Sequence, residues 1–358
     1  MTRKTIAVVG CGHLGTIHAR LLAQREDVEL VAVVDPFPAS RERVAAAHGC
    51  RALSEPAELI GVVSAAVIAA PTGLHAAVAL PLLEAGIDLL IEKPLASTVE
   101  DARNIVTSAR RQGRTVAVGH VERFNPAWEL AVERAGRINY LEASRLAPFT
   151  FRSLDVGVVH DLMIHDIDLV LSLEPGRLEH VEAHGVVATG GHEDAVRARL
   201  TFSSGLVVDL SASRIHPVAK RCISMWSTAG MVEVDFTAKT VEIVGPSVAV
   251  LSGQFVATAV PPGEVTELKE KFFERVLPRE LLTAPERNAI ACEHEDFLAA
   301  IREHRSPRVS AAAGAAALEV ANQVIDSLVM ARFAAPAGAP TVALPQRHYP
   351  SLPRRKTG

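Results

Sequence analysis

The stretch that decides the fold runs from Ile6 to Asp35 and begins Ile6-Ala-Val-Val-Gly10-Cys-Gly12-His-Leu-Gly15. A short apolar run rich in β-branched residues precedes the first glycine, as expected for a strand buried on both faces. The glycines form G-x-G-x-x-G: the first permits a tight turn, the second lets a pyrophosphate approach the backbone, and the third lets the next helix pack closely. That helix directs its free N–H groups and positive dipole end at the phosphates.

A second apolar run, Leu30 to Val34, ends at Asp35, which lies 20 residues after Gly15. A carboxylate there accepts a hydrogen bond from a ribose 2′-hydroxyl and repels a 2′-phosphate. The strand, glycines, helix, second strand and acid occur together, which distinguishes the motif from an ordinary glycine-rich turn. We therefore predict NAD as the cofactor, although Arg41 could contact the 2′-phosphate of NADP.

The composition of the 358 residues narrows the class of protein. The length predicts two domains, and 49% hydrophobic with 22% charged residues is ordinary for a globular protein. A net charge of −4 gives no electrostatic case for binding nucleic acid or an anionic membrane. The apolar runs are too short to span a bilayer, and the chain enters a strand directly after Met1-Thr-Arg-Lys4, so we expect no signal peptide. Four scattered cysteines suit a reducing cytoplasm and argue against a zinc site or disulfides.

Strands and helices alternate up to about residue 121, which predicts an α/β fold with a Rossmann-type, doubly wound parallel sheet over residues 1–121. Strand-like runs joined by turn signals then predict an α+β domain over 122–333, with a large, open, mostly antiparallel sheet and helices on one face. We expect helices over 159–173, 286–303 and 310–333, whereas 264–282 resist assignment. Residues 334–358 contain five prolines and are predicted to be a mobile or loosely draped tail.

One predicted helix carries a polar stripe on an otherwise apolar surface: Asp161-Leu-Met-Ile-His165-Asp-Ile-Asp168. At about 100° per residue, Asp161, His165 and Asp168 share one side. A helix this apolar is buried, and its polar groups must be satisfied by a pocket, a ligand or an internal network. A core network and a metal site both remain open, but we interpret the stripe as a substrate site without metal.

Lys93 stands between Glu92 and Pro94 at the end of a predicted buried strand. Ligands of such sheets bind beyond the carboxyl ends of the strands, so this lysine, Pro71 and His120 should converge on the glycine turn. Lys93 could hydrogen-bond a reacting oxygen or simply bind phosphate. Oxidation of a secondary alcohol by NAD needs a base and a cationic donor. His165 fits the base, Lys93 the donor and Asp161 the group that orients substrate or imidazole.

The chain resembles the glucose-fructose oxidoreductase/inositol dehydrogenase (Gfo/Idh/MocA) family over roughly residues 4 to 333. The matches are the glycine motif, Glu92-Lys93-Pro94, Gly119-His120, Arg123-Phe-Asn-Pro126 and Asp161-x-x-x-His165. The resemblance implies catalysis by Lys93, Asp161 and His165, and homodimers or homotetramers built on the open sheet. Cofactor contacts are expected from Gly10, Gly12, His13, Leu14, Gly15, Asp35, Pro71, His75, Glu92 and Lys93. Substrate contacts are expected from His120, Arg123, Asn125, Asp161, His165 and Asp168.

Two segments, Gly119–Asn125 and Asp161–Asp168, look most like those of bacterial UDP-N-acetylglucosamine 3-dehydrogenases. Those enzymes make a 3-keto nucleotide sugar that an aminotransferase converts for lipid A or other surface glycans. The expected partner is therefore a small sugar or nucleotide sugar. An inositol or free-sugar dehydrogenase is one alternative, and a non-catalytic NAD-binding sensor is another, because fold does not fix function.

Overall fold

The first of two sheets is a six-stranded parallel sheet with the order β3-β2-β1-β4-β5-β6. The structure is a computed structural model, and it describes residues 3–151 and 156–332. The strands are β1 (Lys4–Val9), β2 (Val28–Val34), β3 (Arg51–Leu53), β4 (Ala65–Ile68), β5 (Asp88–Glu92) and β6 (Val116–Gly119). The helices around it are α1 (His13–Ala23), α2 (Pro38–His48), α3 (His75–Glu84) and α4 (Val99–Gln112). The predicted doubly wound sheet is confirmed, and only the three-residue β3 was not foreseen.

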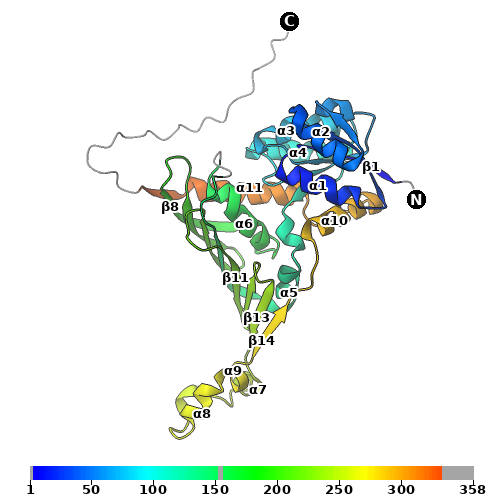
Figure 1. Cartoon of the computed structure of the whole chain (residues 1–358). Helices are drawn as coiled ribbons and strands as arrows, with labels where there is room; N and C mark the ends of the chain where they lie inside the picture. The colour runs from blue at the N-terminus through cyan, green and yellow to red at the C-terminus, as the bar shows by residue number, and fades with distance from the viewer. Residues whose placement is uncertain (1–2, 152–155, 333–358) are drawn as a thin grey trace.

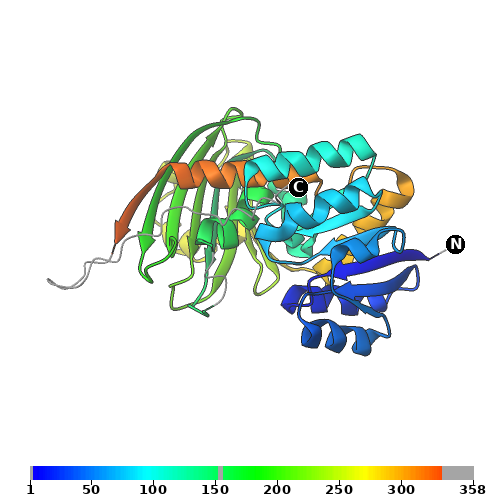
Figure 2. The same ribbon diagram turned by 90° about the horizontal axis from the view of Figure 1, so that it is seen from above.

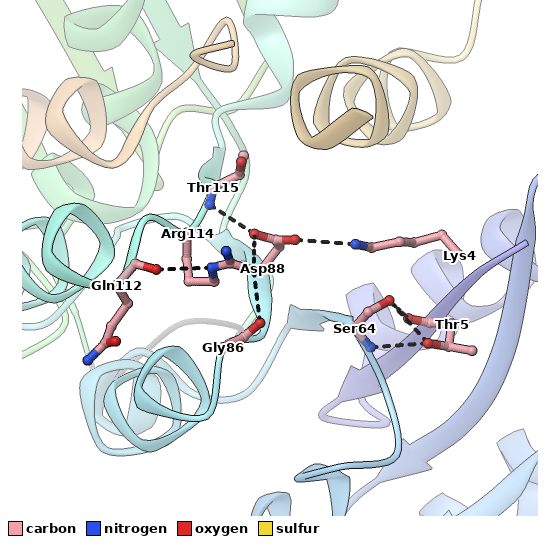
Figure 3. Close-up of polar contacts among 8 residues, drawn as sticks. All are labelled: Lys4, Thr5, Ser64, Gly86, Asp88, Gln112, Arg114 and Thr115. Atoms are coloured by element: carbon pink, nitrogen blue, oxygen red, sulfur yellow. Dashed lines mark hydrogen bonds and ion pairs between the residues drawn. The ribbon is translucent and has the colours of Figure 1, made fainter. Parts of the chain in front are cut away.

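Polar side chains tie the sheet together where its strands begin (Figure 3). The buried carboxylate of Asp88 accepts from Lys4 Nζ at 3.3 Å and from the Thr115 backbone N–H at 3.0 Å. Thr5 and Ser64 join the first residues of β1 to the segment before β4, their hydroxyl oxygens 3.1 Å apart. These contacts stabilise the side of the sheet where the strands begin. The functional groups lie on the opposite side, where the strands end.

The second sheet has nine strands in the order β14-β13-β12-β11-β7-β10-β9-β8-β15. The strands are β7 (Ile138–Leu146), β8 (Leu178–Val187), β9 (Ala195–Phe202), β10 (Val207–Ser213), β11 (Lys220–Ser227), β12 (Gly230–Asp235), β13 (Thr240–Val244), β14 (Arg279–Thr283) and β15 (Leu328–Arg332). Two pairs, β7 with β10 and β8 with β15, are parallel, and the other neighbours are antiparallel. The expectation of a mostly antiparallel sheet is therefore confirmed.

Helices cover one face of this sheet (Figures 1 and 2). They are α5 (Pro126–Ala135), α6 (Ile164–Leu171) and α11 (Ala311–Asp326). Along β7 the side chains alternate: Leu141 and Ala143 are buried in the core beneath the helices, whereas Tyr140 and Glu142 lie on the opposite, open face. This period of two is the pattern expected of a sheet with one covered face.

Two late helices connect the domains. Phe297 and Leu298 of α10 (Ala289–Glu303) lie in the same core cluster as Ile6 of β1. The first half of α11 packs in the Rossmann core, and its second half packs under the nine-stranded sheet. Figure 2 shows α11 running along both domains. The first sheet ends at Gly119, and residues of α10 and α11, which the sequence assigned to the second domain, return to pack on the first.

Two expectations need correction, and one segment left unassigned has a defined structure. The helix predicted over 310–333 ends at Asp326, because Leu328–Arg332 pairs with β8 as strand β15. The helix predicted over 159–173 begins with the π-helix η4 (Val159–Met163) before α6. Residues 264–282, left unassigned, form two helices of an arm that projects from the body and then begin strand β14 at the edge of the nine-stranded sheet (Figure 1). The helices of the arm are α7 (Val248–Leu251), α8 (Val265–Glu270) and α9 (Phe272–Arg275).

Within the described residues there are also four short 3₁₀ helices: η1 (Pro56–Leu59), η2 (Thr72–Leu74), η3 (Val121–Phe124) and η5 (Ala257–Ala259). The tail expected over 334–358 lies outside the described residues.

Replacing Asp88 with alanine tests the amino edge of the first sheet. We expect Asp88→Ala to lower the midpoint of thermal unfolding, because the Thr115 N–H loses its acceptor, a loss of about 1–3 kcal/mol. NAD affinity should not change, since the cofactor edge is opposite. The control is Asp27→Ala, which removes an exposed pair with Arg25 and should change the midpoint little. Equal midpoints for the two variants would contradict this account of Asp88.

Candidate active site

The glycine turn between β1 and α1 has the shape that a dinucleotide phosphate needs. Gly10 has φ +97°, and a Cβ on it would lie 2.5 Å from the Ala69 carbonyl oxygen. A Cβ on Gly15 would lie 1.8 Å from the Gly10 carbonyl oxygen, whereas a Cβ on Gly12 would meet nothing within 4 Å. Gly10 and Gly15 are therefore required by packing, and Gly12 leaves space on the ligand side. In the part of the chain that the structure describes, no side chain caps α1, and its first residues His13 and Leu14 are exposed, so its first N–H groups are available to phosphate.

Asp35 follows β2 and is oriented by the backbone. Its Oδ2 accepts from the Cys11 N–H at 2.8 Å, and its Oδ1 accepts from the Phe37 N–H at 2.9 Å. Each carboxylate oxygen retains acceptor capacity for a ribose hydroxyl. Arg41 donates to the carbonyl oxygens of Asp35 and Pro36 at 3.2 and 3.0 Å, so its guanidinium is engaged by the backbone.

Two residues expected at the cofactor, His75 and Pro71, differ in their surroundings. His75 is buried, and its ring nitrogens lie 3.0 Å from the Pro94 carbonyl oxygen and 2.9 Å from that of Ala70. This geometry favours a packing role for His75 over a cofactor contact, because the ring links the loops after β4 and β5. Pro71 is exposed at the beginning of the loop after β4.

Glu92 is also buried and turns toward a histidine pair that the sequence did not reveal. Its Oε1 lies 2.8 Å from His18 Nε2, and His18 Nδ1 lies 2.7 Å from His294 Nε2. The second carboxylate oxygen accepts from the Lys93 N–H at 3.2 Å. The chain of contacts therefore joins α1, the end of β5 and α10 directly behind Lys93. No local motif signals it, since the two histidines are 276 positions apart.

Lys93 crosses from the first domain to the second. Its Nζ donates to the Asp161 backbone carbonyl at 2.7 Å and to Asp161 Oδ1 at 3.3 Å. Asp161 lies within the π-helix η4, a type of turn found frequently at functional sites. Both side chains are only partly covered, at 15% and 29% exposure. An ammonium group has three donors, so one N–H remains available to a ligand.

His165 and His120 form the next part of the site. Their ring centroids are 6.3 Å apart in an edge-to-face arrangement. Asp168 is buried nearby, with its Oδ1 3.9 Å from Arg123 Nη1. Among the described residues, both ring nitrogens of His120, Nδ1 of His165 and Oδ2 of Asp168 have no hydrogen-bond partner. Such unsatisfied groups are costly and cluster where water or a ligand completes the network.

Burial sets the protonation state of this cluster. It lowers the pKa of His165 well below its usual range, and the positive charges of Lys93 and Arg145 add to the effect. Burial also lowers the pKa of His120 and raises that of Asp168. The lowered pKa keeps the imidazole of His165 in its neutral form, and its Nδ1 has no hydrogen-bond partner among the described residues.

The remaining polar residues are held in structural contacts. Asn125 caps α5 by accepting from the Ala127 N–H at 3.1 Å, and its amide donates to Glu122. Asp166 binds Arg145 through Nη2 at 2.7 Å, and Arg145 Nη1 contacts Glu122 at 2.9 Å. Asp166 lies outside the stripe of Asp161, His165 and Asp168 on a mostly apolar helix, and that position is a signal from which a buried partner could have been predicted. Within 3–151 and 156–332 no group of three or more His, Cys, Asp or Glu residues is arranged for a metal ion. No helix in those ranges is both long and apolar enough to cross a membrane.

The fold and the site define an NAD-binding oxidoreductase. Residues 4–120 match a family model described as an oxidoreductase family with an NAD-binding Rossmann fold, and residues 132–238 match the GFO/IDH/MocA C-terminal domain. The chain belongs to the Gfo/Idh/MocA family, and the resemblance noted in the sequence is confirmed.

Curated relatives and solved structures agree with this assignment. The chain is 35% identical to UDP-N-acetylglucosamine 3-dehydrogenase from Acidithiobacillus ferrooxidans over 326 residues, 90% of this chain and 97% of the relative. A solved structure of that enzyme, GnnA, superposes with a TM-score of 0.79 at 33% identity, covering 92% of this chain and 98% of that one. The chain is also 30% identical to scyllo-inositol 2-dehydrogenase (NAD⁺) from Bacillus subtilis, over 59% of this chain and 67% of the relative.

The position of Asp35 predicts cofactor preference. We expect NAD to bind at least tenfold more tightly than NADP, a difference of about 1.4 kcal/mol, because the carboxylate repels a 2′-phosphate. Calorimetric titration measures both affinities. In Asp35→Asn, which removes the charge but keeps an acceptor, the difference should narrow. Equal or tighter NADP binding by the unaltered enzyme would contradict the prediction and implicate Arg41.

Proposed function

We propose that this oxidoreductase oxidises a secondary hydroxyl of a nucleotide sugar, converting UDP-N-acetylglucosamine to its 3-keto form with NAD. The similarity to the UDP-N-acetylglucosamine 3-dehydrogenase extends over nearly the full length of both chains. The similarity to the inositol dehydrogenase covers a smaller part of this chain. The observation that carries the chemical proposal is the convergence of Lys93 on Asp161, with a neutral histidine on the same helical segment.

The roles of the three residues follow from their charges and contacts. NAD, when bound, accepts the hydride from the carbinol carbon. His165 accepts the proton of the substrate hydroxyl, because its neutral imidazole is available at neutral pH. Lys93 donates its remaining N–H to the same oxygen and stabilises the negative charge that develops there. Asp161 orients Lys93 through its carbonyl and carboxylate oxygens.

The groups around the cofactor turn support the same proposal. Gly12 leaves the backbone open to a pyrophosphate, and Asp35 stands where the adenosine ribose would lie. His120 and Asp168 are proposed to contact the sugar, because they carry buried polar atoms without partners within the described chain. Arg123 and Asn125 are proposed to support these groups from η3 and the start of α5.

Assembly and location are part of the proposal. We propose a homodimer or homotetramer that uses the open face of the nine-stranded sheet, where Tyr140, Arg199 and Asp209 form a polar network. A cytoplasmic location is supported by the free cysteines among the described residues. The 3-keto product would then be available to an aminotransferase that makes precursors of lipid A or other surface glycans.

A substrate comparison tests the proposed function. UDP-N-acetylglucosamine is incubated with enzyme and NAD, and the absorbance of reduced nicotinamide is followed. Mass spectrometry should show a product that has lost two hydrogens. Free N-acetylglucosamine, UDP-glucose and myo-inositol at the same concentration are the comparison substrates. Faster oxidation of myo-inositol than of any UDP-sugar would favour the inositol dehydrogenase alternative and reject the proposal.

Variants of Lys93 and His165 test the mechanism. Lys93→Ala and His165→Ala should each lower kcat by roughly 10²-fold or more, the usual scale for acid–base and charge-stabilising groups. NAD affinity should barely change, because the glycine turn binds the phosphates. Removing Asp161 should raise KM as well as lower kcat.

The pH profile provides the control for His165. Its pKa is lowered, so kcat/KM should rise with pH below neutrality as the imidazole loses its proton, and then level off. This rise of kcat/KM with pH should be absent in His165→Ala. If the His165 variant keeps near-normal turnover and the same rise of kcat/KM with pH, His165 is a core residue. Lys93 and His120 then remain as candidates for the base.

A further inference from the structure

The start of η4, the π-helix that contains Asp161, is held by an acid from another part of the chain. Glu193 lies near the end of the loop between β8 and β9, and its side chain is buried. Its backbone carbonyl accepts from the Val158 N–H at 3.1 Å, and its Oε1 accepts from the Val159 N–H at 3.3 Å. The first N–H groups of a helix have no partner within it, and a carboxylate there also meets the positive end of the helix dipole. Glu193 therefore stabilises the beginning of η4.

Gly157 makes the contact between this acid and the catalytic segment possible. A Cβ on Gly157 would lie 1.9 Å from Glu193 Oε1, so a side chain there would displace the carboxylate. The carbonyl oxygen of Gly157 accepts from the Asp161 N–H at 3.0 Å. Lys93 Nζ in turn donates to the Asp161 carbonyl at 2.7 Å. Direct contacts thus connect Glu193, through Gly157 and Asp161, to the ammonium group that is proposed to meet the reacting oxygen.

The loop that carries Glu193 is itself fixed. The next residue, Asp194, is completely buried and accepts from the Thr189 N–H at 2.8 Å. Arg214 Nε donates to Asp194 Oδ1 at 2.7 Å, and its Nη1 donates to the Val156 carbonyl at 2.9 Å. Arg214 therefore joins the loop to the segment just before η4, so the two sides of the Glu193 contact are fixed relative to each other.

A second contact binds η4 to α11. His160 Nε2 lies 2.8 Å from Asn322 Oδ1, so the residue before Asp161 is attached to the helix that both domains share. π-turns are rare, and many of them lie at functional sites. Contacts from two other segments, Glu193 at its start and Asn322 beside it, hold this one in place.

We propose that Glu193 is a positioning residue, which keeps η4 in the π-turn that presents the Asp161 carbonyl oxygen to Lys93. Without its carboxylate the Val159 N–H loses its acceptor, the start of η4 relaxes, and the ammonium group is displaced from the reacting oxygen. Glu193 acts through Asp161 and Lys93 rather than on the substrate itself. This inference rests on the proposed function, which it deepens by naming a residue that aligns the cationic donor.

Steady-state kinetics at saturating NAD test the inference. Glu193→Ala should lower kcat by roughly tenfold to 10²-fold with little change in KM, because misplacing a reacting group by about 1 Å has an effect on that scale. Glu193→Gln keeps an acceptor oxygen at the same reach and should restore most of the rate. Gly157→Ala retains the acid but displaces it, and should lower kcat as Glu193→Ala does.

The matched control is Gly191→Ala in the same loop. A Cβ on Gly191 would meet no atom of the described chain within 4 Å. This variant should therefore change kcat by no more than about twofold, as expected for a surface substitution. Unchanged NAD binding by each variant shows that it is folded.

Combination with Lys93→Ala separates positioning from a general loss of structure. If Glu193 acts by placing Lys93, Glu193→Ala should change kcat by less than about twofold in an enzyme that already lacks Lys93. Unimpaired kcat in Glu193→Ala and Gly157→Ala, or the same fold-loss with and without Lys93, would overturn the role of Glu193 and leave the proposed function intact. Normal turnover in Lys93→Ala would reject both this inference and the proposed mechanism on which it rests.

Discussion

The ammonium group of Lys93 bound to Asp161 is the contact on which the rest of the site depends. It joins the end of a Rossmann strand to the π-helix that begins the second domain's central helix. Each side of this contact is rigidly supported. Glu92, next to Lys93, is fixed by His18 and His294, and Asp166, on the following helix, is fixed by Arg145. Two buried polar networks thus position one partly exposed pair.

The late helices explain how the two domains can hold so short a contact. The aliphatic residues of α10 and the first half of α11 belong to the cores of the first domain, while the second half of α11 lies under the nine-stranded sheet. Because side chains in a core are closely packed, a helix shared by two cores restricts their relative motion. The first domain is therefore formed by the N-terminal part of the chain and completed by α10 and the first half of α11, which follow most of the second domain in sequence.

Much of the fold followed from local patterns. The glycine motif, the apolar runs of β1 and β2, and the alternation in β7 to β13 each reflect a short-range constraint that one segment contains. The strand β15 could not be predicted from a local pattern. Its residues, Leu328–Arg332, continue the composition of α11 and form a strand only by pairing with β8. Similarly, the π-turn at Val159–Met163 is not visible in a pattern read at about 100° per residue.

The sequence predicted which residues belong to the site better than it predicted the contacts between them. Lys93 was expected to lie near the polar stripe of the helix, and its ammonium group contacts Asp161, since strand ends and helix stripes define direction. The histidine pair behind Glu92 and the partner of Asp166 come from segments far apart in the chain, so only tertiary packing reveals them. His75 and Asn125, both expected near ligands, make contacts to the backbone that any stable loop would need.

The central claim is that this junction removes hydrogen from the sugar C3 position. The most direct measurement uses UDP-N-acetylglucosamine carrying deuterium at C3, with mass spectrometry of the reduced nicotinamide and comparison of the initial rates. We expect deuterium to appear in the reduced cofactor, with a slower rate than for the unlabelled substrate when chemistry limits turnover. Formation of reduced cofactor free of deuterium from the labelled sugar would contradict the account, because another position would then be oxidised.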